Sequence, residues 1–104
     1  MIGNWEPGEH QWIDRITIDM TEDDTGECEV AVSTVLLPTI DYSTGNLVMS
    51  LDPKNGTWET CLFWGSDRSE VVQRYSGERE AYLGHRGWIE RPFAVRSAIK
   101  ESVA

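Results

Sequence analysis

The spacing of the apolar residues changes once along the chain, near Ser76, and this change limits the fold more than any other feature. Before that point, Ile16, Ile18 and Met20 alternate with polar residues, a period of two that is typical of a half-buried strand. After it, one helical face is formed by Ala81, His85, Trp88 and Ile89. Strands first and a helix last predict an α+β fold.

The predicted strands lie before Ser76, in residues 11–20, 28–38, 47–51, 57–64 and 70–75. The intervening DPKNG sequence, residues 52–56, has Pro and Asn-Gly at turn positions, so we expect 47–51 and 57–64 to pair as a hairpin. The whole chain of 104 residues is expected to form a single domain. Its parts are an irregular N-terminus (1–10), a β-sheet (11–75) and a helical region (76–104).

The helical region has its own start and stop signals. Ser76 is the expected N-cap, and Glu78 and Glu80 follow in the first turn, where negative charge suits a helix N-terminus. Pro92 should end or kink this helix. A second short helix should follow, with contacts from Phe93, Ile99 and Val103. We therefore expect an antiparallel sheet of four to five strands with a C-terminal helix packed on one face.

The sequence favours a cytoplasmic protein. No apolar run approaches the roughly 20 residues that a membrane span needs. The beginning, MIGNWEPGEHQW, has neither the basic start nor the apolar core of a signal peptide. Cys28 and Cys61 lie in strand-like segments and are expected to be free thiols, because the cytosol is reducing.

The net charge of −9 is distributed unevenly. Residues 1–52 contain eleven Asp or Glu and one basic residue, whereas residues 53–104 contain seven acidic and eight basic residues. The first half therefore repels nucleic acid and would attract a basic protein surface. A solvated, solubilising surface is the simpler interpretation. The candidate partner-binding residues are Glu22, Asp23, Asp24, Glu27 and Glu29. The opposite charges of the two halves are also compatible with a homodimer.

Five Trp residues exceed the need of one small core. Packing in the core and at its edge is the simpler explanation, and an exposed aromatic patch for recognition is the alternative. Arginines near a Trp could also hold a small anionic ligand such as a nucleotide messenger. The candidate ligand-binding residues are Arg74, Arg79, His85, Arg86 and Trp88.

His85 is the most obvious candidate for acid–base chemistry, and its sequence neighbours do not support that role. Glu80 and Glu90 lie five residues away on either side, and no carboxylate lies at the better spacings of three or four. We expect a half-buried His that is hydrogen-bonded to a strand carbonyl or to Thr60. No catalytic residue is assigned, and a small hydrolase using His85 remains an alternative.

Metal and cofactor sites are not predicted. The His and Cys residues lack the paired spacings of zinc ligands, and neither STGN nor KNGT has the length and lysine of a phosphate-binding loop.

Three short motifs resemble those of a family of small uncharacterised proteins from actinobacteria and their phages. They lie in the segments VSTV (32–35), ETCLF (59–63) and RYSGEREAYLGHRGWIE (74–90). The matching residues of the third are Arg74, Tyr75, Ser76, Glu80, Ala81, Gly84, His85 and Glu90. Residues 38–57, the N-terminal segment and the tail after Pro92 depart from the family pattern. The resemblance implies an α+β fold and a phage or prophage setting, and it implies no activity.

These features together predict a phage-associated, non-enzymatic binding protein in the cytoplasm of a host cell. The expected partner is a host protein with a basic surface, such as a component of antiviral defence, engaged through acidic and aromatic residues. A protein that sequesters a nucleotide messenger is the second hypothesis.

Overall fold

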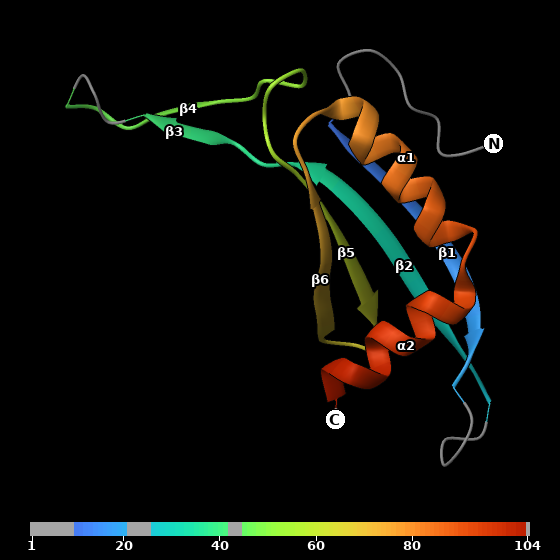
Figure 1. The fold of residues 1–104 in the computed structure, drawn as a ribbon. Helices are drawn as coiled ribbons and strands as arrows, with labels where there is room; N and C mark the ends of the chain where they lie inside the picture. The colour runs from blue at the N-terminus through green and yellow to red at the C-terminus, as the bar shows by residue number, and fades with distance from the viewer. Residues whose placement is uncertain (1–9, 21–25, 42–44, 104) are drawn as a thin grey trace.

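The chain folds into a four-stranded antiparallel sheet with two helices on one face and a two-stranded ribbon that projects from one end (Figure 1). This computed structural model describes residues 10–20, 26–41 and 45–103. The strands are β1 (Gln11–Asp19), β2 (Glu27–Leu36), β3 (Thr39–Asp41), β4 (Val48–Ser50), β5 (Trp58–Trp64) and β6 (Arg68–Tyr75). The helices are α1 (Glu78–Ile89) and α2 (Pro92–Val103). The α+β prediction is confirmed.

The main sheet has the order β1-β2-β5-β6, and every neighbouring pair is antiparallel. Alternation along the strands gives the sheet two different faces. The face under the helices buries most of its side chains, as the pattern of β5 illustrates: Trp58, Thr60, Leu62 and Trp64 are buried, while Phe63 on the other face is exposed.

The predicted pairing of 47–51 with 57–64 is wrong. β4 pairs with β3, which lies in a segment expected to be a loop, and β5 pairs with β2 and β6. The reason is the turn at Asp52, whose side chain accepts hydrogen bonds from the backbone N–H groups of Lys54 and Asn55. The backbone of Gly56 also donates to the Asp52 carbonyl at 2.7 Å. Such a compact turn redirects the chain and does not close a two-residue hairpin.

The core beneath the helices consists of two apolar clusters. The cluster near α2 includes Val32, Leu62, Val95 and Ile99, all fully buried. The cluster near α1 comprises Trp12, Leu36, Trp58, Tyr75 and Ala81. The Trp12 and Trp58 rings stack with centroids 5.0 Å apart. Ile99 is thus a core contact, as predicted.

The N-cap of α1 differs from the sequence prediction, whereas α1 ends before Pro92 and a second helix follows, as predicted. Gly77, not Ser76, is the N-cap of α1, and its φ of 137° is a conformation that favours glycine. Pro92 begins α2, where its missing N–H costs nothing. Phe93 is 76% exposed and makes no core contact, contrary to prediction. The side chain of Val103 lies outside the described residues.

Cys28 and Cys61 are free, as predicted, and both are half-buried. Cys28 packs against the core cluster near α2, whereas Cys61 lies on the face of the sheet that the helices do not cover.

Candidate functional site

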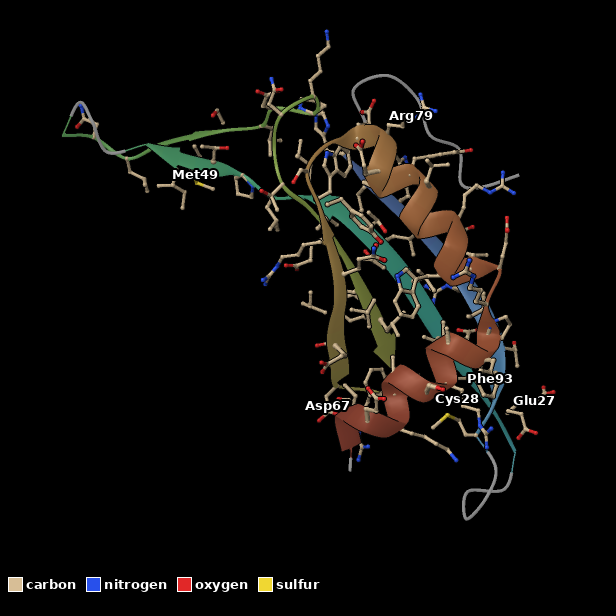
Figure 2. All side chains as sticks on the ribbon, viewed as in Figure 1. Glu27, Cys28, Met49, Asp67, Arg79 and Phe93 are labelled. Atoms are coloured by element: carbon tan, nitrogen blue, oxygen red, sulfur yellow. The ribbon has the colours of Figure 1, made fainter. Side chains whose placement is uncertain are left out.

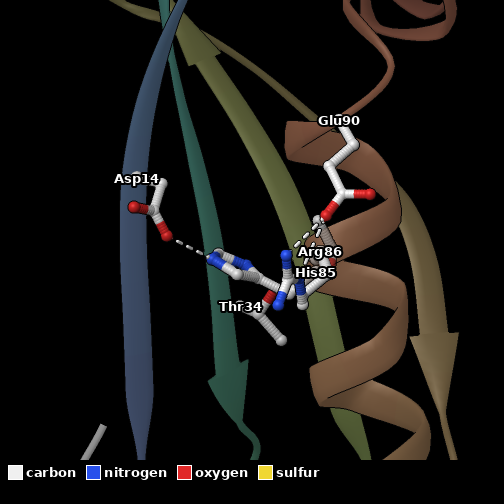
Figure 3. Close-up of polar contacts among 6 residues, drawn as sticks. Asp14, Thr34, His85, Arg86 and Glu90 are labelled. Atoms are coloured by element: carbon white, nitrogen blue, oxygen red, sulfur yellow. Dashed lines mark hydrogen bonds and ion pairs between the residues drawn. The ribbon is translucent and has the colours of Figure 1, made fainter. Parts of the chain in front are cut away.

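A chain of hydrogen-bonded side chains runs through the core between the sheet and α1. The His85 ring lies at its centre: Nε2 is 2.9 Å from Asp14 Oδ2, and Nδ1 is 2.7 Å from Thr34 Oγ1. Figure 3 shows Asp14 and Thr34 reaching His85 from two neighbouring strands. Thr34 Oγ1 is 2.6 Å from Thr60 Oγ1, which is 2.9 Å from the Tyr75 hydroxyl.

The register of the sheet places these groups. Thr34 lies opposite Thr60 across the β2–β5 pair, and Thr60 lies opposite Gln73 across the β5–β6 pair. Cross-strand neighbours on one face are close enough to bond through short side chains. α1 then lays His85 over this row, one turn after Ala81. Five elements, β1, β2, β5, β6 and α1, therefore share one polar network.

The positions of the protons follow from the acceptor at one end of the network. An ionised Asp14 only accepts, so Nε2 of a neutral His85 carries the proton and Nδ1 accepts from the Thr34 hydroxyl. Thr60 then donates to Thr34, and Tyr75 donates to Thr60. The Tyr75 hydroxyl also donates to Gln73 Oε1 at 3.2 Å. Every buried polar group of the network thus has a partner, as a stable interior requires.

Burial sets the charge state of the network. It lowers the pKa of His85 below its ordinary value of 6.5, and the hydrogen bond and negative charge of Asp14 oppose this effect. Burial likewise raises the pKa of Tyr75, against the opposing effect of its hydrogen bonds. The favoured state at neutral pH is therefore a neutral imidazole beside a neutral phenol.

Asp14, His85 and Thr34 have the connectivity of a carboxylate–base–hydroxyl triad, but a substrate cannot reach the hydroxyl of Thr34 or the ring of His85. Thr34 and His85 are each 0% exposed, beneath α1 and between the two apolar clusters. Nucleophilic catalysis requires an accessible attacking atom next to its base. In this structure the arrangement joins the helix to the sheet and does not present a reactive hydroxyl.

Sequence analysis correctly predicted that His85 is hydrogen-bonded within the structure, but it did not identify all of its partners. His85 is fully buried, not half-buried, and it bonds to Thr34 directly and to Thr60 only through Thr34. Its carboxylate partner, Asp14, is 71 residues away in the sequence and was not predicted. A signal was present in the sequence, because Thr34, Thr60, Tyr75 and His85 all lie in the three short segments 32–35, 59–63 and 74–90 that sequence analysis singled out.

A shallow groove of about 270 Å³ lies where α1, α2 and β6 meet. Its polar groups are Gln73 and Arg91, beside the ring of Trp88. Gln73 Oε1 accepts hydrogen bonds from Trp88 Nε1 at 3.0 Å and from Tyr75, so its amide N–H groups are left to donate outward. Arg91 makes no ion pair within the described part of the chain. The groove thus offers hydrogen-bond donors and a positive charge.

The five predicted ligand-binding residues do not lie together. Arg74 pairs with Glu59 on the uncovered face of the sheet, with 3.0 Å between the charged groups. Arg79 is exposed near the start of α1, where Figure 2 labels it, and Arg86 pairs with Glu90 at 2.7 Å. His85 is sealed in the core. Only Trp88 lines the groove, and sequence analysis did not predict its neighbours there, Gln73 and Arg91.

Three of the described acidic residues lie together at one end of the β1–β2 pair. Glu27 and Glu29 are exposed, and Asp19 lies directly opposite Glu27 in the register. Like charges opposite each other destabilise a sheet. Glu22, Asp23 and Asp24, which belong to the predicted partner-binding set, lie outside the described residues. Arg15 forms an ion pair with Glu29, with 3.4 Å between the charged groups.

The tryptophans that the structure describes serve the core. Trp12, Trp58 and Trp64 are buried, and Trp88 is half-buried. Among the described residues, the large exposed aromatic side chains are instead those of Phe63 and Phe93. Within the described ranges, no group of three or more His, Cys, Asp or Glu side chains could hold a metal ion. No helix of the described chain has the length and apolarity to cross a membrane.

Comparisons with known proteins give no relative for this chain: no family model, no curated protein and no solved structure matches it.

Proposed function

We propose that this chain is a non-enzymatic binding protein that engages a host protein through its acidic end, in a phage or prophage setting. The observation that carries the proposal is the contrast between the sealed interior and the outside. His85 and Thr34 are fully buried, whereas Asp19, Glu27 and Glu29 lie exposed together at the end of the β1–β2 pair. Binding at the surface fits this arrangement better than chemistry at His85.

The acidic end brings two carboxylates side by side. Asp19 lies directly opposite Glu27 in the register, and both residues are exposed. Such an arrangement attracts a basic partner over distances of about 10 Å and speeds the encounter. The phage setting and the host cytoplasm rest on the resemblance of the three motifs to actinobacterial and phage proteins. A component of antiviral defence is the target class that this setting suggests.

A second candidate function is the sequestration of a small anionic molecule, such as a nucleotide. The groove beside Trp88 favours this function, because Arg91 and the side-chain amide of Gln73 line it and both offer hydrogen-bond donors to a ligand. Gly87 supports this interpretation. It lies in the last turn of α1, a helical position where glycine costs up to about 1 kcal/mol relative to alanine, and no heavy atom lies within 4 Å of a Cβ built on it. Packing therefore does not explain the glycine, and an open groove does.

Neutralising the acidic end should slow association with the partner. The partner is captured from host lysate on the immobilised protein, identified by mass spectrometry, and purified for kinetics. Replacing Glu27 and Glu29 with Gln should lower the on-rate several-fold and flatten its salt dependence, with a smaller effect on the off-rate. Adding Glu22→Gln, Asp23→Asn and Asp24→Asn should enlarge the effect. The melting temperature should not fall, because self-repulsion decreases.

The matched control removes the same charge elsewhere. Glu78→Gln with Glu80→Gln neutralises two carboxylates in the first turn of α1, at the opposite end of the sheet (Figure 1). This control should leave the on-rate nearly unchanged. An equal effect of both pairs would show that net charge alone matters and would refute a specific acidic site. If a nucleotide still binds after each of the two double substitutions but no longer binds to Arg91→Ala, the second candidate function is favoured.

A further inference from the structure

The ribbon of β3 and β4 has one strongly apolar side that faces solvent. Ile40 lies opposite Met49 in the register, and alternation places Leu47 and Leu51 on the same side as Met49. These four side chains are between 48% and 59% exposed. Figure 1 shows the ribbon projecting beyond the sheet and away from the helices, and it contributes to the length of 54 Å in a molecule that is 20 Å thick.

A ribbon of this kind is marginal on its own. Two strands without a third strand or a covering helix are barely stable in water, and β3 and β4 pair over only three residues each. Four half-exposed side chains of this size present on the order of 400 Å² of apolar surface, as much as the largest patch on an ordinary monomer. A second surface that covers the ribbon would stabilise its two strands and remove their apolar side chains from water.

The face of the main sheet opposite the helices provides such a surface. One row across the four strands consists of Ile13, Ser33, Cys61 and Val71, and Phe63 lies in the next row on β5. Ile13, Phe63 and Val71 are 41% to 49% exposed, and both described helices pack on the other face. Together the ribbon and this sheet face hold seven of the nine large apolar side chains that are exposed in the described chain.

Charge indicates what covers these two surfaces. The chain carries a net charge of −9, so most of its surface repels a second copy. Around the row of Ile13, Ser33, Cys61 and Val71 the sheet face is neutral, because its ion pairs, Arg15 with Glu29 and Arg74 with Glu59, each balance. Asp19 and Glu27 are on the same face but lie at the far end of the β1–β2 pair from this row. Residues 39–51 contain a single charged residue, Asp41. The two neutral apolar surfaces are therefore where two acidic copies can meet without bringing acid against acid.

We infer that the protein forms a twofold dimer in which the ribbon of each copy packs on the uncovered sheet face of the other. A stable interface buries about 800 Å² on each partner, roughly twice what the ribbon alone offers. A reciprocal arrangement uses the ribbon and the sheet face of both copies at once and so approaches that area. A twofold axis also makes the contact self-limiting, which prevents chains of copies.

This inference is independent of the proposed host partner, and salt separates the two. Association of two negatively charged copies through apolar surfaces should tighten when salt screens their repulsion, as it does on going from about 0.05 M to about 0.5 M. Association of the acidic end with a basic partner should weaken over the same range. Failure of one prediction therefore leaves the other untouched.

Sedimentation equilibrium of the purified chain tests the dimer. The wild-type protein should dimerise, and Met49→Glu or Phe63→Glu should raise the dimer dissociation constant at least about tenfold, as loss of a central apolar contact does. Two controls add the same charge elsewhere: Ser50→Glu on the opposite side of the ribbon, and Phe93→Glu on α2, where Phe93 is 76% exposed. Both should change the constant less than about threefold.

Three results would overturn the inference. They are a monomer at every concentration and salt, an equal effect of the control substitutions, and a dimer that Met49→Glu disrupts but Phe63→Glu does not. The last result would show that the ribbons contact each other instead. All four positions are exposed or on the ribbon, so circular dichroism should show that the variants keep the fold.

Cross-linking between copies gives a second measurement that leaves the apolar residues intact. In a background of Cys28→Ser and Cys61→Ser, one protein carries Asn46→Cys next to the ribbon and another carries Ser69→Cys on the sheet face; both positions are exposed. A short bis-maleimide should link the mixture of the two far more than either protein alone. Cross-linking of the Asn46→Cys protein to itself at an equal or higher yield would contradict the reciprocal contact.

Discussion

Gly84→Ala should destabilise the protein by about 3 kcal/mol, at the upper end of what overpacking a core costs. A Cβ built on Gly84 would overlap the Tyr75 ring, with the three nearest ring and hydroxyl atoms at 2.1 to 2.4 Å. The ring cannot yield, because Tyr75 is buried and its hydroxyl is held by Thr60. α1 would have to move away from β6, and the contacts of Ala81 and His85 would loosen with it. Chemical denaturation measures the free energy of unfolding.

Gly87→Ala is the matched control on the same helix. It should stabilise the protein by about 0.5–1 kcal/mol, because alanine has the higher helix propensity and the added Cβ meets no atom within 4 Å. The two substitutions differ only in what the new methyl group contacts. If both variants were equally stable, the close packing of Tyr75 on Gly84 would be wrong.

His85→Ala should cost about 3 kcal/mol, through the cavity left by the ring and the loss of partners for buried groups. Thr34 loses the acceptor of its hydroxyl, and the Asp14 carboxylate loses its donor. His85→Gln should cost less, about 1–2 kcal/mol, because the amide fills part of the space and bonds to one partner. Unfolding of both variants and of the wild type by denaturant provides the comparison.

Binding of the host partner by these variants separates structure from function. If His85 only supports the fold, His85→Gln should bind the partner with unchanged rates at a temperature well below its melting point. A variant that melts like the wild type but no longer functions would show that His85 acts directly. The control is Thr34→Val. It removes the hydroxyl that bonds to His85 and changes strand β2 instead of helix α1.

The sequence predicted the fold class because its signals are local. The alternation in 11–20, the β-branched apolar composition of 28–38 and the helical spacing after Ser76 each depend on neighbouring residues. They correspond to β1, β2 and α1 of the structure. The hairpin between 47–51 and 57–64 failed because the DPKNG segment supports more than one turn. Its Asp52 side chain selects the compact form, and this leaves Val48–Ser50 to pair with Thr39–Asp41.

The contacts of the candidate site depend on the register between distant segments, which no local pattern contains. Residue spacing could show that His85 lies on the apolar side of a helix, but not that β1 brings Asp14 to it. The groove was missed for the same reason, because Gln73 and Arg91 belong to different elements. The exposed side of the ribbon could not be expected either, since an apolar segment such as Leu47–Leu51 usually indicates a strand of the core.

A sealed, neutral His85 in the core should make the stability of the protein depend on pH in the acid range. Because burial lowers the pKa of His85 in the folded state, the unfolded chain takes up a proton first as the pH falls. The contribution of His85 to stability is therefore complete above pH 6.5. It decreases below that value by up to about 1.4 kcal/mol per pH unit until the folded-state pKa is reached.

The most direct measurement is an NMR titration of the His85 imidazole between about pH 4 and pH 8, assigned with the His85→Gln variant. We predict one tautomer above pH 6.5, protonated at Nε2, and a titration midpoint below 6.5. A midpoint at or above 6.5, or a mixture of tautomers at neutral pH, would show that burial does not set the charge state of the ring. That result would contradict the sealed network and return His85 to the list of candidate catalytic groups.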